Sequence, residues 1–163
     1  TSQSEGDTIQ HERARWLAFY LGAEETAPQR PKVAVPGFGT EILHSPWAAI
    51  EKGLSVQEAE SLRQRTHMSV KRFGQFIPRT TLQSKRQGNQ RLSTEQSDRI
   101  MRIADAYAHA ACVFGDSERA ERWMKRTNPQ MPQERTPEEM LETSYGARIV
   151  DEALTQLEHG IPA

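Results

Sequence analysis

The sequence predicts an all-α protein, and three observations support this fold class. Helix-capping patterns, in which Ser or Thr stands three residues before Glu or Gln, occur at Ser55, Ser93 and Thr136. Apolar residues recur at the three- and four-residue spacing of helices. No segment keeps the apolar–polar alternation of a strand. With 36% hydrophobic and 26% charged residues, the chain of 163 residues can bury a modest core beneath a polar surface.

The N-terminal part predicts one helix followed by a linker. Residues 9–22 carry five side chains on one helical face: Ile9, Arg13, Trp16, Leu17 and Tyr20. Residues 23–44 contain three prolines and two glycines, which forbid a continuous helix. We therefore expect residues 1–44 to form an arm, an N-terminal helix and an extended linker, that docks only with a partner. Trp16 is then the better interface candidate among the three tryptophans.

Four short helices are expected next, at residues 45–53, 55–67, 69–76 and 78–88. Ser45 precedes Pro46, and proline is favoured at the first helical position. Ser69 can cap the third of these helices. The Ile77-Pro78 pair separates the third from the fourth, with Pro78 in the first turn of the fourth.

The rest of the chain predicts the longest helix and three more. The longest runs from Ser93 to Gly115, Asp116 caps the next, and Thr136 opens another. The last spans residues 145–159, with an apolar stripe of Val150, Ala153, Leu154 and Leu157. Glu138 and Glu139 are interpreted as first-turn acids that stabilise a helix dipole.

The charge distribution singles out the middle of the chain. The net charge is only −1, yet residues 61–94 contain no Asp or Glu. Eight of the 21 Lys and Arg residues lie there: Arg63, Arg65, Lys71, Arg72, Arg79, Lys85, Arg86 and Arg91. Because phosphate binding needs a local positive field, this segment is the candidate nucleic-acid surface.

Within that segment, two short helices meeting at a tight break are typical of a helix-turn-helix, whose second helix enters the major groove of DNA. The polar side chains around the apolar anchor Leu82 are suited to base edges and phosphates. The predicted DNA-binding residues are Arg79, Thr80, Thr81, Gln83, Ser84, Lys85 and Arg86.

The C-terminal third carries a long ordered set of motifs. These are Val113-Phe-Gly-Asp116, Ala120-Glu-Arg-Trp123, Thr127-Asn-Pro129, Thr136-Pro137, Met140-Leu-Glu-Thr143, Gly146, Val150 and Leu157-Glu-His-Gly160. They resemble the Xre/MbcA/ParS antitoxins, whose C-terminal toxin-binding domain pairs with RES-domain toxins. The similarity extends upstream through residues 88–110 and covers residues 45–163. One departure is Met131-Pro132-Gln133, where family members often carry a Gly-Gly loop.

The resemblance implies a helix-turn-helix domain at residues 45–110 and a small helical toxin-binding domain at residues 111–163. It also implies an antitoxin that covers the active site of a cognate RES-domain, NAD-consuming toxin. Together with that toxin it would bind its operator, double-stranded DNA, and repress its own operon. Carried onto this chain, the toxin-binding residues are Tyr145, Gly146, Arg148, His159, Gly160, Ile161, Pro162 and Ala163. Since helix-turn-helix proteins act on paired half-sites, we expect a homodimer or a larger hetero-oligomer with the toxin.

An alternative reading keeps the helix-turn-helix but not the toxin. On that reading the chain is a stand-alone transcriptional repressor whose C-terminal module dimerises or binds a ligand. An enzyme is not predicted, because no nucleophile–base pair is apparent and we assign neither catalytic residues nor a cofactor.

Two further classes of function find no support in the sequence. His109 and Cys112 lie three residues apart, but no second pair completes a metal site, and we interpret Cys112 as a small buried side chain. No apolar run approaches the roughly 20 residues of a membrane span. The polar first ten residues show no signal-peptide core, so we expect a cytoplasmic protein.

Overall fold

The computed structural model describes residues 2–28 and 46–160, and these residues contain helices and no strand. The α-helices are α1 (Ser2–Tyr20), α3 (Pro46–Lys52), α4 (Val56–Arg65), α5 (Val70–Phe76), α6 (Arg79–Gln87), α7 (Thr94–Phe114), α8 (Ser117–Lys125), α9 (Pro137–Met140) and α10 (Ser144–Glu158). A 3-10 turn, η1, spans Pro132–Glu134. No described helix is both long and apolar enough to cross a bilayer.

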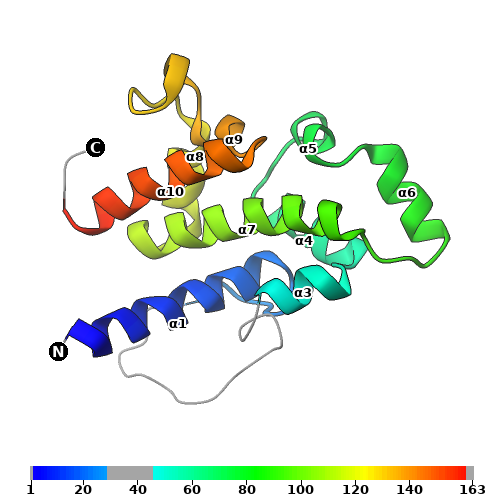
Figure 1. Ribbon diagram of the computed structural model, residues 1–163, viewed down its shortest axis with the longest axis horizontal. Helices are drawn as coiled ribbons and strands as arrows, with labels where there is room; N and C mark the ends of the chain where they lie inside the picture. The colour runs from blue at the N-terminus through cyan, green and yellow to red at the C-terminus, as the bar shows by residue number, and fades with distance from the viewer. Residues whose placement is uncertain (1, 29–45, 161–163) are drawn as a thin grey trace.

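Helix α7 is the centre of the fold. Figure 1 shows it running through the middle of the molecule, with α1 along one side and α10 along the other. Its inward side chains are completely buried: Ile100, Ile103, Ala104, Tyr107, Ala108, Ala110 and Ala111. Helical spacing predicted five of these, all but Ala108 and Ala110, together with Phe114, which is only partly buried. The alanines leave room for neighbouring helices to approach closely, so several helices share this one surface.

Helix α1 is part of this core, and the prediction of an arm that docks only with a partner is wrong. Trp16, Leu17, Tyr20 and Leu21 are at most 3% exposed. Tyr20 packs edge-on against Tyr107 of α7, with ring centroids 5.6 Å apart. The apolar stripe therefore fits the face of α7 and leaves Trp16 unavailable to a partner. The linker predicted for residues 23–44 lies outside the described residues from residue 29 onward.

The predicted caps explain where most helices begin. Ser55, Ser69 and Asp116 each accept the backbone N–H of the residue three positions later. Ser93 and Thr136 form the complete two-way capping box. Pro78 differs slightly from expectation: it is the residue before α6, with φ −58° and ψ 139°, rather than a residue of its first turn. Helix starts were thus predictable from local sequence.

A polar network joins α1 to the far side of the core. The guanidinium of Arg13 donates to Asp105 of α7 at 2.8 and 3.1 Å and to Asp151 of α10 at 3.2 Å. Asp151 also accepts from the Nδ1 of the buried His109 at 2.8 Å. The hydrogen bond from His109, followed by the charge of Arg13, lowers the pKa of Asp151 despite its partial burial.

We expect Asp151→Asn to lower the free energy of unfolding near neutral pH, because it removes a charged partner of Arg13 and His109. The effect should be only about 1 kcal/mol, because solvent screens this half-exposed carboxylate. A carboxylate whose folded-state pKa is lowered stabilises the protein above its unfolded-state pKa, and this stabilisation fades as the pH falls through the folded-state value. In urea unfolding, the free energy of unfolding of Asp151→Asn should therefore lie below that of the wild type at pH 7. This difference should become smaller towards pH 3. Glu152→Gln, at the exposed neighbouring position, is the control. An equal difference at both pH values would contradict the role of the charge.

Candidate functional site

Helices α5 and α6 form the predicted pair of short helices around a tight turn. Ile77 between them is extended, with φ −139° and ψ 123°, and its side chain is completely buried. Phe73 and Phe76 anchor α5, whereas Leu82 is the one buried side chain of α6. Figure 1 shows α6 at the edge of the molecule, away from α1 and α10. Most of α6 is therefore free to contact a partner.

The structure brings the predicted DNA-binding residues together on this exposed helix. Five of them are exposed: Arg79, Thr80, Gln83, Ser84 and Arg86. Thr81 and Lys85 are half-buried. The long polar side chains surround a single apolar anchor, which is the arrangement that a helix entering the major groove requires.

Four of the eight basic side chains of residues 61–94 are committed to protein partners. Arg65 donates to the carbonyl oxygens of Phe19 and Glu24. Arg91 donates to the carbonyl oxygen of Gly53 at 2.8 Å.

The other two committed cations are paired with carboxylates. Arg86 pairs with Glu60 at 2.7 Å, and Arg72 pairs with glutamates at the start of the C-terminal part. Of the eight basic side chains of residues 61–94, the other four have no such partner among the described residues 2–28 and 46–160: Arg63, Lys71, Arg79 and Lys85. About half of the basic side chains of residues 61–94 are thus free to contact phosphate directly.

On the C-terminal side, Tyr145 and Arg148 form an exposed pair at the start of α10. Tyr145 is 69% exposed, and the guanidinium of Arg148 lies 5.7 Å from the centroid of its ring. An exposed aromatic ring beside a cation is a frequent component of protein interfaces. His159 and Gly160 are exposed at the end of the helix, whereas Ile161, Pro162 and Ala163 lie outside the described residues.

Gly146 is placed differently from its neighbours. It is buried, and a Cβ atom added there would lie 1.9 Å from the carbonyl oxygen of Met140. A buried glycine offers no surface to a partner, so the toxin contact expected at this position has no structural support. Gly146 instead permits the close approach of α10 to the end of α9.

Glu138 lies in the first turn of α9, as predicted, but its burial was not predicted. It is 7% exposed, and one of its carboxylate oxygens accepts a hydrogen bond from the hydroxyl of Tyr107. Burial, followed by the charge of Glu138, raises the pKa of Tyr107 well above its usual value. No local signal in the sequence distinguishes a buried first-turn acid from an exposed one. Its neighbour Glu139 does fulfil the expected capping role with Thr136.

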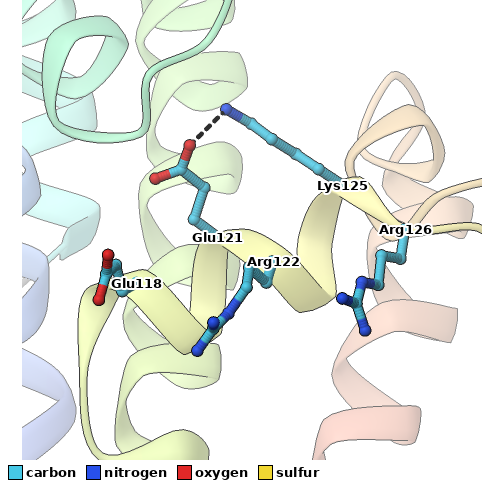
Figure 2. Close-up of a pocket in the computed structure, with 5 residues that line it drawn as sticks. All are labelled: Glu118, Glu121, Arg122, Lys125 and Arg126. Atoms are coloured by element: carbon cyan, nitrogen blue, oxygen red, sulfur yellow. Dashed lines mark hydrogen bonds and ion pairs between the residues drawn. The ribbon is translucent and has the colours of Figure 1, made fainter.

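Helix α8 borders an open groove of about 360 Å³. Its lining residues are Glu118, Glu121, Arg122, Lys125 and Arg126. Figure 2 shows the Glu121–Lys125 ion pair on one side of α8, with Arg122 and Arg126 extending from the other. A groove made by charged side chains of one helix does not enclose a small apolar ligand.

Lys125 also connects α8 to the turn between α4 and α5. Its Nζ atom donates to the carbonyl oxygens of Thr66 and His67, at 2.9 Å each. The C-terminal part of the chain thereby holds the beginning of the helix pair.

The region around His109 and Cys112 is a structural polar cluster. His109 is engaged by Asp151 on one side and lies 3.6 Å from Glu158 on the other. Burial raises the pKa of the Cys112 thiol to about 12, which keeps it protonated and unreactive. In the part of the chain that the structure describes, no three potential ligands are arranged to hold a metal ion.

Two family models match the chain in series. The antitoxin Xre-like helix-turn-helix domain matches residues 48–105, and the antitoxin Xre/MbcA/ParS C-terminal toxin-binding domain matches residues 109–160. The molecule is therefore an all-α helix-turn-helix protein with a C-terminal toxin-binding domain. The chain belongs to the Xre/MbcA/ParS family of antitoxins, as its motifs predicted.

Curated relatives agree with this assignment. The antitoxin Xre of Pseudomonas putida is 39% identical over 90 residues, covering 53% of this chain and 54% of that protein. The antitoxin Xre of Photorhabdus laumondii is 37% identical over 75 residues, covering 45% and 50%. The chain thus spans about half the length of these two relatives. With the antitoxin Xre of Yersinia enterocolitica it shares 32% identity over 150 residues, covering 91% and 90%.

We expect Gly146→Ala to destabilise the protein by about 1–3 kcal/mol, because the added methyl group must displace the backbone of Met140. Gly74→Ala is the matched control, since no atom lies within 4 Å of its added Cβ and alanine favours a helix by up to ~1 kcal/mol over glycine. Thermal unfolding of both variants checks this. Equal melting temperatures would show that α10 has room at Gly146.

Proposed function

We propose that this protein is a cytoplasmic antitoxin that neutralises a RES-domain, NAD-consuming toxin and represses its own operon. The observation that carries the proposal is the presence of two different outward faces on one core. One is α6 with its unpaired cations, and the other is the start of α10 with its exposed Tyr145–Arg148 pair. Each face lies in a part of the chain that matches the corresponding family domain.

On the DNA face, α6 would enter the major groove of the operator. Arg79 and Lys85 carry positive charge that no described protein group neutralises. Thr80, Gln83 and Ser84 lie exposed beside them and can donate to or accept from base edges and phosphates. Thr81 and Arg86 belong to the same proposed surface, with Arg86 exchanging its ion pair to Glu60 for a phosphate.

On the toxin face, Tyr145 and Arg148 supply a partly preorganised anchor, because the ring and the guanidinium already lie against each other. We propose that His159, Gly160 and the residues after them reach towards the entrance of the toxin's active site. Covering that entrance would exclude NAD⁺ without chemistry by the antitoxin. Gly146 is left out of this surface because it is buried.

The proposed organisation keeps a helix-turn-helix domain at residues 45–110 and a toxin-binding domain at residues 111–163. Residues 1–44 precede both, and the described helix α1 packs on α7, which spans the boundary. We propose that the protein self-associates, so that two copies of α6 meet paired half-sites.

Two double variants with opposite expected effects on DNA binding and toxin neutralisation test the proposal. Arg79→Ala with Lys85→Ala should weaken binding to the DNA upstream of the chain's own reading frame. The slope of the logarithm of the binding constant against the logarithm of the salt concentration should become shallower by about one per lost phosphate contact. The same variant should still rescue growth when co-expressed with its toxin, which the proposal expects to be a RES-domain protein encoded by the adjoining reading frame. Tyr145→Ala with Arg148→Ala should do the opposite, losing rescue and co-purification while keeping DNA affinity.

Two controls match these variants in residue type. Arg135→Ala removes an exposed cation outside the helix pair, and Trp47→Ala removes an aromatic ring that is 67% exposed on α3. Both should behave as wild type in both assays. If Tyr145→Ala with Arg148→Ala neutralises the toxin fully, the proposed toxin face is wrong. If DNA binding shows no dependence on salt, the proposed DNA face is wrong.

A further inference from the structure

Arg72 of α5 lies at the junction between the two family domains. Its guanidinium is bonded to Glu139 at 3.2 Å and to Glu142 at 3.1 Å, and its Nε atom lies 3.8 Å from Glu138. It also donates to Gln75 on its own helix at 2.7 Å. Arg72 falls within the helix-turn-helix match and the three glutamates within the toxin-binding match. One of the eight basic side chains of residues 61–94 therefore makes its contacts across the domain junction.

This junction is anchored deep in the core. Glu138 is buried and its second oxygen accepts from the hydroxyl of Tyr107, which is completely buried in α7. A buried carboxylate requires a cation and hydrogen-bond donors, and here Arg72 and Tyr107 supply them. Tyr107 in turn packs on Tyr20 of α1. Contacts thus run without interruption from α5 through the start of α9 to the central helix.

Besides the buried Ile77, the Lys125 contacts before α5 and the ion pair of Arg86 with Glu60, the helix pair has few other anchors. Helix α5 has seven residues with two buried side chains, and α6 has nine residues with one. The forked guanidinium of Arg72 bonds in several directions at once, so it restrains the rotation of α5 in a way that a single apolar contact cannot. Because only Ile77 and Pro78 separate the two helices, the orientation of α5 constrains that of α6, together with the contacts of α6 with α4.

We infer that Arg72 is a positioning residue for DNA binding rather than a phosphate contact. Its bonds to Glu139 and Glu142 hold α5 so that α6 meets the major groove, and the C-terminal domain thereby contributes to operator affinity. This inference rests on the proposed DNA-binding function.

Neutralising the glutamates changes DNA affinity in opposite directions for a positioning role and for two simpler roles, a phosphate contact by Arg72 and a long-range effect of the glutamate charges. If Arg72 contacted phosphate, neutralising its glutamates would release it and tighten DNA binding. If the glutamates acted only through their long-range field, removing negative charge near DNA would also tighten binding. If they position α5, the same neutralisation weakens binding.

The test measures operator affinity of full-length Glu139→Gln/Glu142→Gln by fluorescence anisotropy, using the DNA upstream of the chain's own reading frame at several salt concentrations. We expect binding about fivefold weaker or more, the lower end of typical coupling between sites, with the wild-type salt slope. Glutamine at position 139 keeps the capping box with Thr136, so α9 should stay folded.

Arg72→Lys is the second variant, and it keeps the positive charge while losing the fork. A phosphate contact would survive this change, whereas a positioning role predicts a loss of affinity in the same direction. Glu118→Gln/Glu152→Gln makes the same change in net charge at exposed sites away from α5, and should bind DNA as tightly as wild type or slightly more tightly.

Binding by Glu139→Gln/Glu142→Gln that equals or exceeds the wild-type affinity would overturn the inference, as would wild-type affinity in Arg72→Lys. Circular dichroism melts establish that each variant is folded at the assay temperature. If the wild-type protein itself shows no preference for the operator over unrelated DNA, the proposed DNA-binding function fails, and the inference fails with it.

Discussion

The burial of α7 among α1, α8 and α10 is the constraint on which the rest of the structure depends. Ala104, Ala108 and Ala111 are completely buried and bring neighbouring backbones close, while Tyr107 fills the space where α1 and α9 approach. Among the described residues 2–28 and 46–160, α1, α8 and α10 each make most of their contacts with other helices against α7. Because hydrophobic burial is the main driving force for folding, these helices can be stable only while they share α7.

This sharing connects the two family domains. Helix α7 begins inside the helix-turn-helix match and ends inside the toxin-binding match. Polar contacts reinforce the connection, from Lys125 to the α4–α5 turn and from Arg72 to the glutamates near α9. The proposed DNA face and toxin face therefore point outward from a common core, and helix α1, which neither family model covers, closes that core.

The sequence was sufficient for features that depend on neighbours within a few residues. The caps at Ser69 and Ser93, the buried face of α7 and the exposed face of α6 follow from local spacing, and the structure confirms them. Features set by distant residues were not predictable. Trp16 resembled an interface residue because its partner helix lies about 90 residues further on. Arg72 was counted with the positive charge of residues 61–94 because its partner Glu142 is 70 residues away. Periodicity carries no information about such pairs.

The most direct test of two separate faces on one core is hydrogen–deuterium exchange of the full chain alone, with operator DNA and with the RES-type protein. The account predicts that α7 exchanges most slowly throughout, that DNA slows exchange in α6, and that the toxin slows it in the first turns of α10. Exchange in α7 faster than in the helices around it, or a toxin that protects α6 and leaves α10 unchanged, would contradict the account.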